Sequence, residues 1–166
     1  HDGIDAIGFI GSSATAAKIQ KTAGLKRSIM ECSGNGPVVV LADADLKRAA
    51  KAAVDGAFFC AGQVCCATER VIVHKDVHEA FVKEVLEYAK ATVKLGDPFA
   101  EGTNLGPLNN ELVAVKMDTH MADARERGLD ILLGGCRSPD FATDHYYEFT
   151  VVDNVTEDSL LSREES

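Results

Sequence analysis

Short apolar runs alternate along this chain with longer segments in which apolar residues recur every three or four positions. A short apolar run bounded by turn residues is typical of a strand, and the longer spacing is typical of a helix packed on one face. The predicted strands cover residues 4–10, 26–32, 38–41, 70–74, 130–133 and 146–152, and the predicted helices cover 14–22, 45–59, 77–92 and 109–127. This alternation predicts βαβ units and an α/β fold with a mostly parallel sheet flanked by helices.

Two of the predicted strands have distinctive apolar patterns. Residues 4–10 form a short strand that we expect to be buried, and a glycine and serine turn follows it. The run Val38–Leu41 is apolar at every position, which predicts a strand covered on both faces. The sequence Gly34-Asn35-Gly36-Pro37 before this run predicts a break in regular structure.

Composition narrows the class of protein. The chain has 166 residues, which indicates one domain or one domain with a fragment of another. Its net charge of −9 is spread along the chain, which argues against nucleic acid or an anionic membrane as a partner. No apolar run approaches the roughly 20 residues that span a bilayer, and the N-terminus has no signal-peptide pattern. Because the first residue is His1 rather than Met, we expect the chain to start inside a longer gene product.

The cysteines indicate a reducing compartment, for which we expect the cytoplasm. Their number is odd and two are adjacent, a pattern that does not suit a disulfide framework. No Cys-x-x-Cys pair has matching partners, and the histidines show no ligand spacing around the thiols, so no metal site is predicted. The five are Cys32, Cys60, Cys65, Cys66 and Cys136.

Two segments carry candidate chemistry. Residues 58–66 place thiols, including Cys65, in a glycine-interrupted loop between a predicted helix and strand, and such loops often carry reactive groups. Residues 31–37 place Glu31 at a strand end before a flexible turn, a suitable position for a general base. From these residues alone, a small buried structural thiol is more common than a nucleophile, and a lone glutamate at a strand end is usually solvated.

Several ordered motifs resemble the aldehyde dehydrogenase superfamily. Residues 31–37, Glu-Cys-Ser-Gly-Asn-Gly-Pro, are similar to its Glu-Leu-Gly-Gly-Lys-Ser/Asn-Pro, and Gly62-Gln63-Val64-Cys65 matches Gly-Gln-x-Cys, whose cysteine is the nucleophile. The 34-residue separation of Glu31 and Cys65 is also that of the family. Further matching segments are Phe9–Ser13, Asp43–Leu46, Gly96–Pro98, Gly106–Leu108 and Arg163–Glu165.

The resemblance implies a three-layer α/β fold, truncated at both ends. Residues 1–30 would end the NAD(P)-binding domain, and residues 31–166 would form an incomplete catalytic domain. The implied reaction oxidises an aldehyde to a carboxylate: the Cys65 thiolate attacks the carbonyl, NAD(P)⁺ accepts hydride, and Glu31 activates water against the resulting thioester. The backbone N–H of Cys65 would help to stabilise the oxyanion.

The resemblance also implies cofactor-binding residues. Gly11 and Ser12 open a helix directly after a strand, where free N–H groups suit a pyrophosphate. Glu165 matches the family glutamate that holds the ribose hydroxyls on the nicotinamide side. The partners implied are a small aldehyde and NAD or NADP, and the parent protein would be a homo-oligomer, either a dimer or a tetramer.

Departures from the family pattern lower the activity expected of these residues alone. Ser33 replaces a glycine of the Glu31 motif and Ala16 replaces a glycine near the cofactor, so the turn is expected to be stiffer and the approach more crowded. The family's oxyanion asparagine and the Phe-Gly-Pro after Glu165 are not among the 166 residues. We therefore expect little or no turnover by this stretch alone.

The other thiols and the competing functions complete the predictions. Cys32, Cys60 and Cys136 are predicted to pack in the interior, and Cys66 to pack or line the pocket. The alternatives are a CoA-acylating dehydrogenase, which Glu31 disfavours, and a non-catalytic scaffold or binding protein. A thiol hydrolase would need a histidine base that no motif supplies. The leading hypothesis requires that Cys65 and Glu31 face one cavity.

Overall fold

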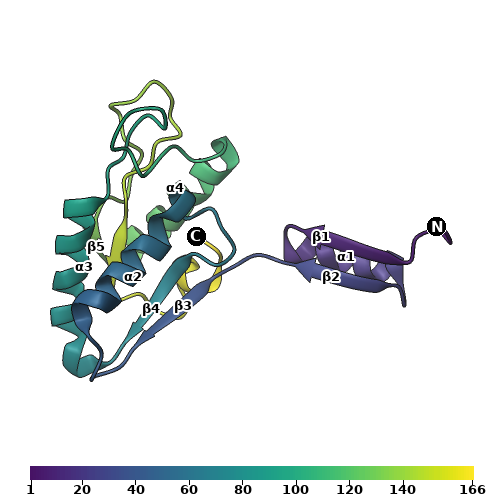
Figure 1. The fold of residues 1–166 in the computed structure, drawn as a ribbon, viewed down its shortest axis with the longest axis horizontal. Helices are drawn as coiled ribbons and strands as arrows, with labels where there is room; N and C mark the ends of the chain where they lie inside the picture. The colour runs from purple at the N-terminus through teal and green to yellow at the C-terminus, as the bar shows by residue number, and fades with distance from the viewer. The chain divides into compact units, whose positions relative to one another are not determined.

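A computed structural model describes residues 1–166, which divide into two compact units, His1–Gly34 and Asn35–Ser166 (Figure 1). The division falls a few residues after the domain boundary expected at residue 30. It lies at the glycine-rich break 34–37, where glycine and proline interrupt regular structure. Assigning the two parts to cofactor-binding and catalytic domains stays a prediction.

The first unit is one βαβ unit. Strand β1 (Ala6–Ile10) pairs in parallel with β2 (Arg27–Glu31), and helix α1 (Ser13–Ala23) connects them. The Ser12 side chain caps α1 by accepting a hydrogen bond from the Thr15 N–H, 3.3 Å between the heavy atoms. The predicted strand–helix–strand order is therefore confirmed. The helix supplies the crossover connection that two parallel strands require.

Strand β1 is not buried, so the burial predicted from the sequence was wrong. Ile10 is 84% exposed, Ile29 of β2 is 75% exposed, and Ala16 is the one buried residue of this unit. A pair of strands with one helix has one uncovered face, so apolar character alone does not bury a strand.

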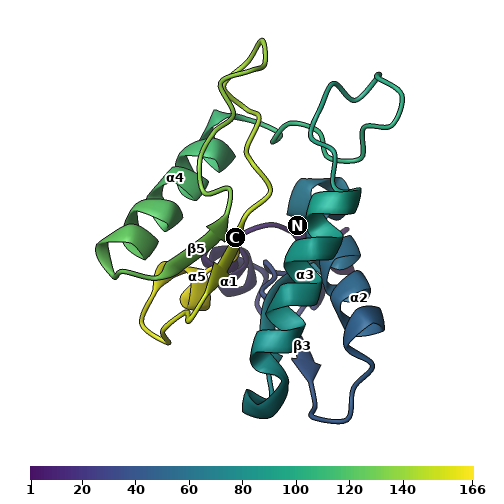
Figure 2. The ribbon, with the colours of Figure 1, turned by 90° about the vertical axis from the view of Figure 1, so that its left-hand side faces the viewer.

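The second unit begins with two strands and two helices. Strand β3 (Gly36–Val40) pairs in parallel with β4 (Thr68–Val73). Helix α2 (Leu46–Phe58) crosses between them, and α3 (His78–Thr92) follows β4 and lies beside α2 (Figure 2). Short 3-10 turns, η1 (Phe59–Gly62) and η2 (Lys75–Val77), precede β4 and α3. The core is mainly aliphatic and consists of Val40, Ala50, Ala53, Val54, Phe81, Val85 and Ala89.

The rest of the second unit packs around helix α4 (Glu111–Glu126). Strands β5 (Asp130–Leu133) and β6 (Val151–Asp153) pair antiparallel, and the short α5 (Leu160–Arg163) packs near α4. A second buried cluster consists of Leu108, Ala114, Met121, Ala124 and Tyr147. The predicted strand over residues 146–152 is shorter than expected, because Tyr147 makes only an isolated bridge to Arg137.

The α/β fold is confirmed, and two of the three strand pairs are parallel. The β5–β6 pair is antiparallel because no helix connects these strands, and a loop suffices for antiparallel pairing. The run Val38–Leu41 is covered on one face only: Val39 is 61% and Leu41 is 60% exposed. The expectation of burial on both faces was therefore wrong for this chain.

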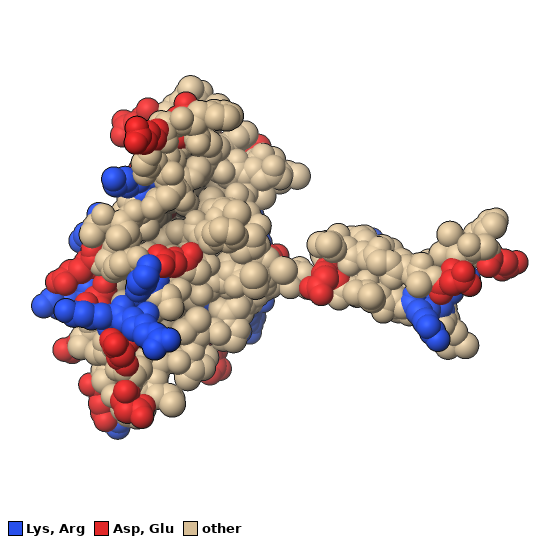
Figure 3. Space-filling model, viewed as in Figure 1, with Lys and Arg blue, Asp and Glu red and all other residues tan.

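The surface of the second unit mixes charges of both signs. On the face shown in Figure 3, lysine and arginine side chains lie next to aspartate and glutamate side chains. A cluster of both signs joins the loop after β5 to α4: Arg137 Nη2 lies 2.9 Å from Glu111 Oε1 and 2.7 Å from Asp118 Oδ2. These hydrogen bonds raise the pKa of Arg137. No helix combines the length and the apolar character that crossing a bilayer requires.

The burial of Phe81 generates a test of the core. Phe81 is 3% exposed and packs among the helices and strands of the second unit, whereas Phe99 is 98% exposed. We expect Phe81→Ala to lower the free energy of unfolding by about 3–5 kcal/mol, because it removes buried surface and leaves a cavity. Phe99→Ala should change it by less than about 0.5 kcal/mol. Urea unfolding followed by circular dichroism measures both, and similar losses would contradict this description of the core.

Candidate active site

Cys65 lies on the loop between α2 and β4. Three consecutive residues there, Cys60, Ala61 and Gly62, have left-handed backbones with φ between 51° and 75°. This turn ends α2 and reverses the chain. Backbone bonds from Val64 N to the Gly62 carbonyl and from Ala67 N to the Val64 carbonyl, both 2.9 Å, then shape the loop around Cys65.

Gln63 ties this loop to the rest of the second unit. Its Oε1 accepts a hydrogen bond of 2.7 Å from the Asn109 N–H, and its Nε2 donates one of 3.2 Å to the Cys60 carbonyl. The glutamine of the Gly-Gln-x-Cys motif therefore acts here as a brace between two loops. The sequence alone does not reveal this role, because the partner, Asn109, lies 46 residues away in the chain.

Two glycines let the start of β4 approach its neighbours closely. A Cβ on Gly36 would lie 2.2 Å from the Ala67 carbonyl oxygen, and one on Gly56 would lie 2.6 Å from Thr68 Oγ1. Residues 67 and 68 immediately follow the Cys65–Cys66 pair, so these contacts set where the thiol loop enters the strand. Sequence reasoning treated Gly36 only as part of a break and did not identify Gly56.

The Cys65 side chain is exposed, and no cysteine forms a disulfide. Two thiols depart from the packing predicted for them, since Cys60 and Cys136 are also exposed. Cys66, predicted to pack or to line the pocket, is exposed as well. Cys60 lies in the left-handed turn that ends α2, and Cys136 follows two positive-φ glycines, so each is in a surface turn rather than the core. Cys32 is half-buried. Exposure alone therefore does not distinguish Cys65 from its neighbours.

The first unit brings together three more of the predicted site residues, Glu31, Gly11 and Ser12. Glu31 is the last residue of β2 and pairs in register with Ile10, so Gly11 and Ser12 follow at the same end of the strands. The Gly11 N–H donates a hydrogen bond of 3.0 Å to the Glu31 carbonyl. The carboxyl ends of parallel strands commonly carry ligand sites. Glu31 belongs to the first unit and Cys65 to the second, so a cavity shared by the two stays a prediction.

Ser33 has a φ of 76°, in the left-handed region that favours glycine. The resemblance placed a family glycine at this position, and the backbone keeps a conformation that a glycine adopts without cost. The turn after Glu31 is therefore more strained in this chain than it would be with glycine, as the substitution suggested.

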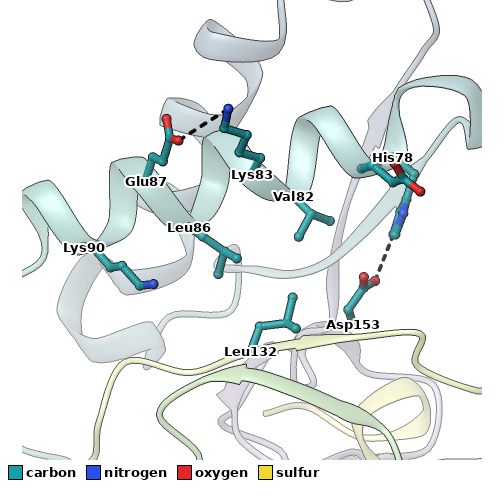
Figure 4. A pocket seen from close by; sticks show the side chains of 9 residues that line it. His78, Val82, Lys83, Leu86, Glu87, Lys90, Leu132 and Asp153 are labelled. Atoms are coloured by element: carbon teal, nitrogen blue, oxygen red, sulfur yellow. Dashed lines mark hydrogen bonds and ion pairs between the residues drawn. The ribbon is translucent and has the colours of Figure 1, made fainter.

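Cys65 lines neither of two prominent cavities of the second unit. The larger, about 750 Å³, is mainly apolar, with Phe58, Phe81, Leu108, Met121 and Phe149 in its wall and Glu69 and Arg70 among its polar residues. The smaller is a surface groove along α3, where Val82, Leu86 and Leu132 form an apolar floor (Figure 4). At one end of the groove His78 Nε2 and Asp153 Oδ1 are 2.9 Å apart.

Glu165 lies in a short segment held against β4. The Ser166 N–H donates a hydrogen bond of 3.0 Å to Glu69 Oε2, so the segment after α5 contacts the strand that follows the Cys65 loop. Burial raises the pKa of Glu69, the Ser166 N–H partly opposes this, and the negative charge of Glu165 adds to the rise. Glu165 is thus close to a second carboxylate on β4.

Comparison with known proteins identifies the family of the chain. Residues 1–166 match the aldehyde dehydrogenase family throughout. The chain belongs to this family. Curated aldehyde dehydrogenases that it resembles include the peroxisomal aminoaldehyde dehydrogenase 1 of Pisum sativum, which is 38% identical over 99% of this chain and 33% of the relative. The lactaldehyde dehydrogenase of Methanococcus maripaludis is 36% identical over 100% of this chain and 34% of that protein.

Solved aldehyde dehydrogenases share the fold. The enzyme KauB from Pseudomonas aeruginosa aligns with a TM-score of 0.92 and 32% identity, over 99% of this chain and 34% of that one. The NAD-dependent aldehyde dehydrogenase from Sinorhizobium meliloti aligns with a TM-score of 0.89 and 33% identity, over 98% of this chain and 32% of that one. The chain therefore spans about a third of the length of the aldehyde dehydrogenases it matches.

The close approach at Gly36 generates a second test. We expect Gly36→Ala to lower the free energy of unfolding by about 1–3 kcal/mol, because the new methyl group must displace the Ala67 carbonyl. The matched control is Gly8→Ala in β1, where a Cβ meets no atom within 4 Å. Thermal unfolding of both variants measures the difference. Equal stability of the two would show that the start of β3 is not confined in this way.

Proposed function

We propose that the protein containing this chain is an NAD(P)-dependent aldehyde dehydrogenase that oxidises a small aldehyde to a carboxylate. The observation that carries this proposal is the exposed Cys65 thiol in the Gly-Gln-x-Cys loop, within a chain that matches the family from end to end. An exposed thiol is accessible to a carbonyl carbon, and sulfur is both a soft nucleophile and an acceptable leaving group.

In the proposed reaction, the Cys65 thiolate adds to the aldehyde to form a thiohemiacetal, and oxidation leaves a thioester on the same sulfur. NAD(P)⁺, when bound, supplies the hydride acceptor. Glu31 then takes a proton from water as the water attacks the thioester, which releases the carboxylate and restores the thiol.

The residues proposed for cofactor binding have suitable chemistry. The first turn of α1 carries no acidic side chain, so nothing on that turn repels the pyrophosphate expected near Gly11 and Ser12. The Glu165 carboxylate can accept hydrogen bonds from two ribose hydroxyls. Among the relatives, a D-glyceraldehyde dehydrogenase is named for NADP⁺ and a Staphylococcus aureus betaine aldehyde dehydrogenase was solved with NAD⁺, so we propose NAD or NADP for this protein.

The substrate class, location and assembly are parts of the same proposal. The relatives are named for aminoaldehydes, betaine aldehyde, glyceraldehyde and lactaldehyde, which supports a small aldehyde substrate. We propose a cytoplasmic homo-oligomer, a dimer or a tetramer. Some relatives are named as peroxisomal or chloroplastic, so localisation of the tagged whole protein is the test of the compartment.

Substitution of the nucleophile tests the proposal directly. In the whole protein, Cys65→Ser should lower kcat for aldehyde oxidation by at least about 10³-fold, because the hydroxyl is a far weaker nucleophile than a thiolate. Cys66→Ser is the matched control, being adjacent and also exposed, and should keep kcat within about threefold. NADH formation measured by absorbance distinguishes them. Full activity in Cys65→Ser would rule out the assigned nucleophile and favour the scaffold hypothesis.

Substitution of the base tests the second half of the reaction. Glu31→Gln should leave a rapid burst of one NADH per active site and slow the steady state by about 10²–10⁴-fold, because general base catalysis of hydrolysis is lost. Stopped-flow absorbance measures the burst, and mass spectrometry measures the acyl group on Cys65. Loss of the burst together with the steady state would place Glu31 outside the hydrolytic step. An acyl-CoA product from the wild-type protein with added CoA would instead support the CoA-acylating alternative.

The isolated 166 residues provide a separate expectation. The chain covers about a third of the length of its relatives, so we expect the isolated residues to turn over at less than about 1% of the whole protein's rate. This rate corresponds to a loss of more than about 2.7 kcal/mol in transition-state stabilisation. The measurement is NADH formation at saturating aldehyde and NAD(P)⁺. Turnover equal to that of the whole protein would show that every essential group lies in this chain.

A further inference from the structure

The segment Ser162–Ser166 is held by polar side chains from separate parts of the second unit. Asn35, just before β3, donates through Nδ2 to the Ser162 carbonyl at 3.2 Å and to the Glu164 carbonyl at 3.3 Å. Glu69 of β4 accepts a hydrogen bond from the Ser166 N–H at 3.0 Å. These contacts hold the end of the chain against the β3–β4 pair (Figure 1).

His120 of α4 adds a third contact. Its side chain is 1% exposed, and Nε2 lies at an ion-pair distance of 3.5 Å from Glu164 Oε2. Neither ring nitrogen of His120 makes a hydrogen bond. Burial lowers the pKa of His120, and the Glu164 carboxylate partly opposes this. The buried His120 imidazole thus contacts the half-exposed Glu164 carboxylate and orients that side chain, while Asn35 holds the Glu164 backbone.

Polar groups in this cluster are only partly satisfied. Asn35 Oδ1, Glu69 Oε1 and both His120 ring nitrogens are buried without a hydrogen-bond partner, as is Nε of Arg70, whose Nη2 donates to the Asn35 carbonyl at 3.2 Å. A buried polar atom without a hydrogen-bond partner destabilises the fold. Apolar side chains would fill the same space without this cost, so stability alone does not account for the cluster.

The contacts lie on both sides of Glu165. The Glu164 backbone is held by Asn35 and the Ser166 backbone by Glu69, so the residue between them has its main chain fixed at both neighbours. Its carboxylate lies close enough to β4 to influence the ionisation of Glu69. Fixing the backbone on either side limits where the Glu165 side chain can reach and lowers the entropy lost when it binds a ligand.

We propose that Asn35, Glu69 and His120 are positioning residues that hold Glu165 in place to accept hydrogen bonds from the ribose hydroxyls of NAD(P)⁺. This inference rests on the proposed function and assigns to three further residues a role in cofactor affinity. None of the three needs to touch the cofactor, since each acts through the segment that carries Glu165. The competing explanation is that the cluster anchors the chain without any effect on the cofactor.

The experiment measures NADH binding by the whole protein through the change in NADH fluorescence, which does not depend on turnover. Asn35→Ala and His120→Leu should each raise the Kd for NADH about fivefold to twentyfold, because preorganisation of Glu165 is lost. Glu69→Ala should do the same, whereas Glu69→Gln keeps an acceptor for the Ser166 N–H and should stay within about twofold. Glu165→Gln should raise the Kd at least as much as any of them.

A double variant separates positioning from anchoring. If Asn35 acts through Glu165, adding Asn35→Ala to Glu165→Gln should raise the Kd no further. Asn104→Ala is the matched control, because the Asn104 amide also joins two backbone segments, with Nδ2 2.7 Å from the Thr92 carbonyl and Oδ1 2.7 Å from the Lys94 N–H. The control should leave the Kd unchanged.

Each outcome bears on the inference. Full additivity in the double variant, or an unchanged Kd in Asn35→Ala and His120→Leu, would overturn the positioning role while leaving the proposed function intact. A wild-type protein that binds neither NADH nor NADPH would overturn the proposed function itself. If His120→Leu fails to fold, the Glu69→Ala and Glu69→Gln pair still decides, because only a positioning role predicts rescue of affinity by the glutamine.

Discussion

The backbone of Gly36 meets the carbonyl oxygen of Ala67 where β3 and β4 begin, with no room for a side chain between them. This contact sets the start of the parallel register, Gly36 opposite Thr68, and an irregularity follows at Pro37, which has no N–H to donate. Since Ala67 lies two residues after Cys65, the same contact fixes one end of the thiol loop. The other end is fixed by the left-handed turn through Cys60, Ala61 and Gly62. The position of the candidate nucleophile thus follows from close backbone approach rather than from side-chain packing.

Both ends of the second unit depend on this arrangement. Asn35 directly precedes Gly36 and holds the segment around Glu165, while Glu69 lies two residues after Ala67. The candidate nucleophile and the candidate ribose-binding carboxylate are therefore connected to the same few residues at the start of the β3–β4 pair. A displacement of the start of the β3–β4 pair should therefore move both Cys65 and Glu165, because closely packed protein structure transmits strain.

The chain also leaves a large part of its apolar surface uncovered. Val39 of β3, Leu41 directly after it and Ile72 of β4 are each more than half exposed, and a mainly apolar cavity of about 750 Å³ lies within the second unit. Each sheet has only two strands. The core consequently rests on two modest clusters of buried side chains, and the helices α2, α3 and α4 contribute most of the residues in them.

The sequence by itself determined the local elements and the chemistry that they carry. Every helix longer than four residues lies close to the predicted range, because apolar spacing and caps such as Ser12 and Asp45 act within a few residues. Cys65 and Glu31 were identifiable because the Gly-Gln-x-Cys and Glu31 motifs are contiguous.

Tertiary structure decided what depends on distant partners: the exposure of Cys60 and Cys136, the antiparallel pairing of β5 and β6, the brace from Gln63 to Asn109, and the contacts of Asn35 and His120 with the Glu165 segment. Burial and pairing depend on residues far away in the chain, which no local pattern encodes.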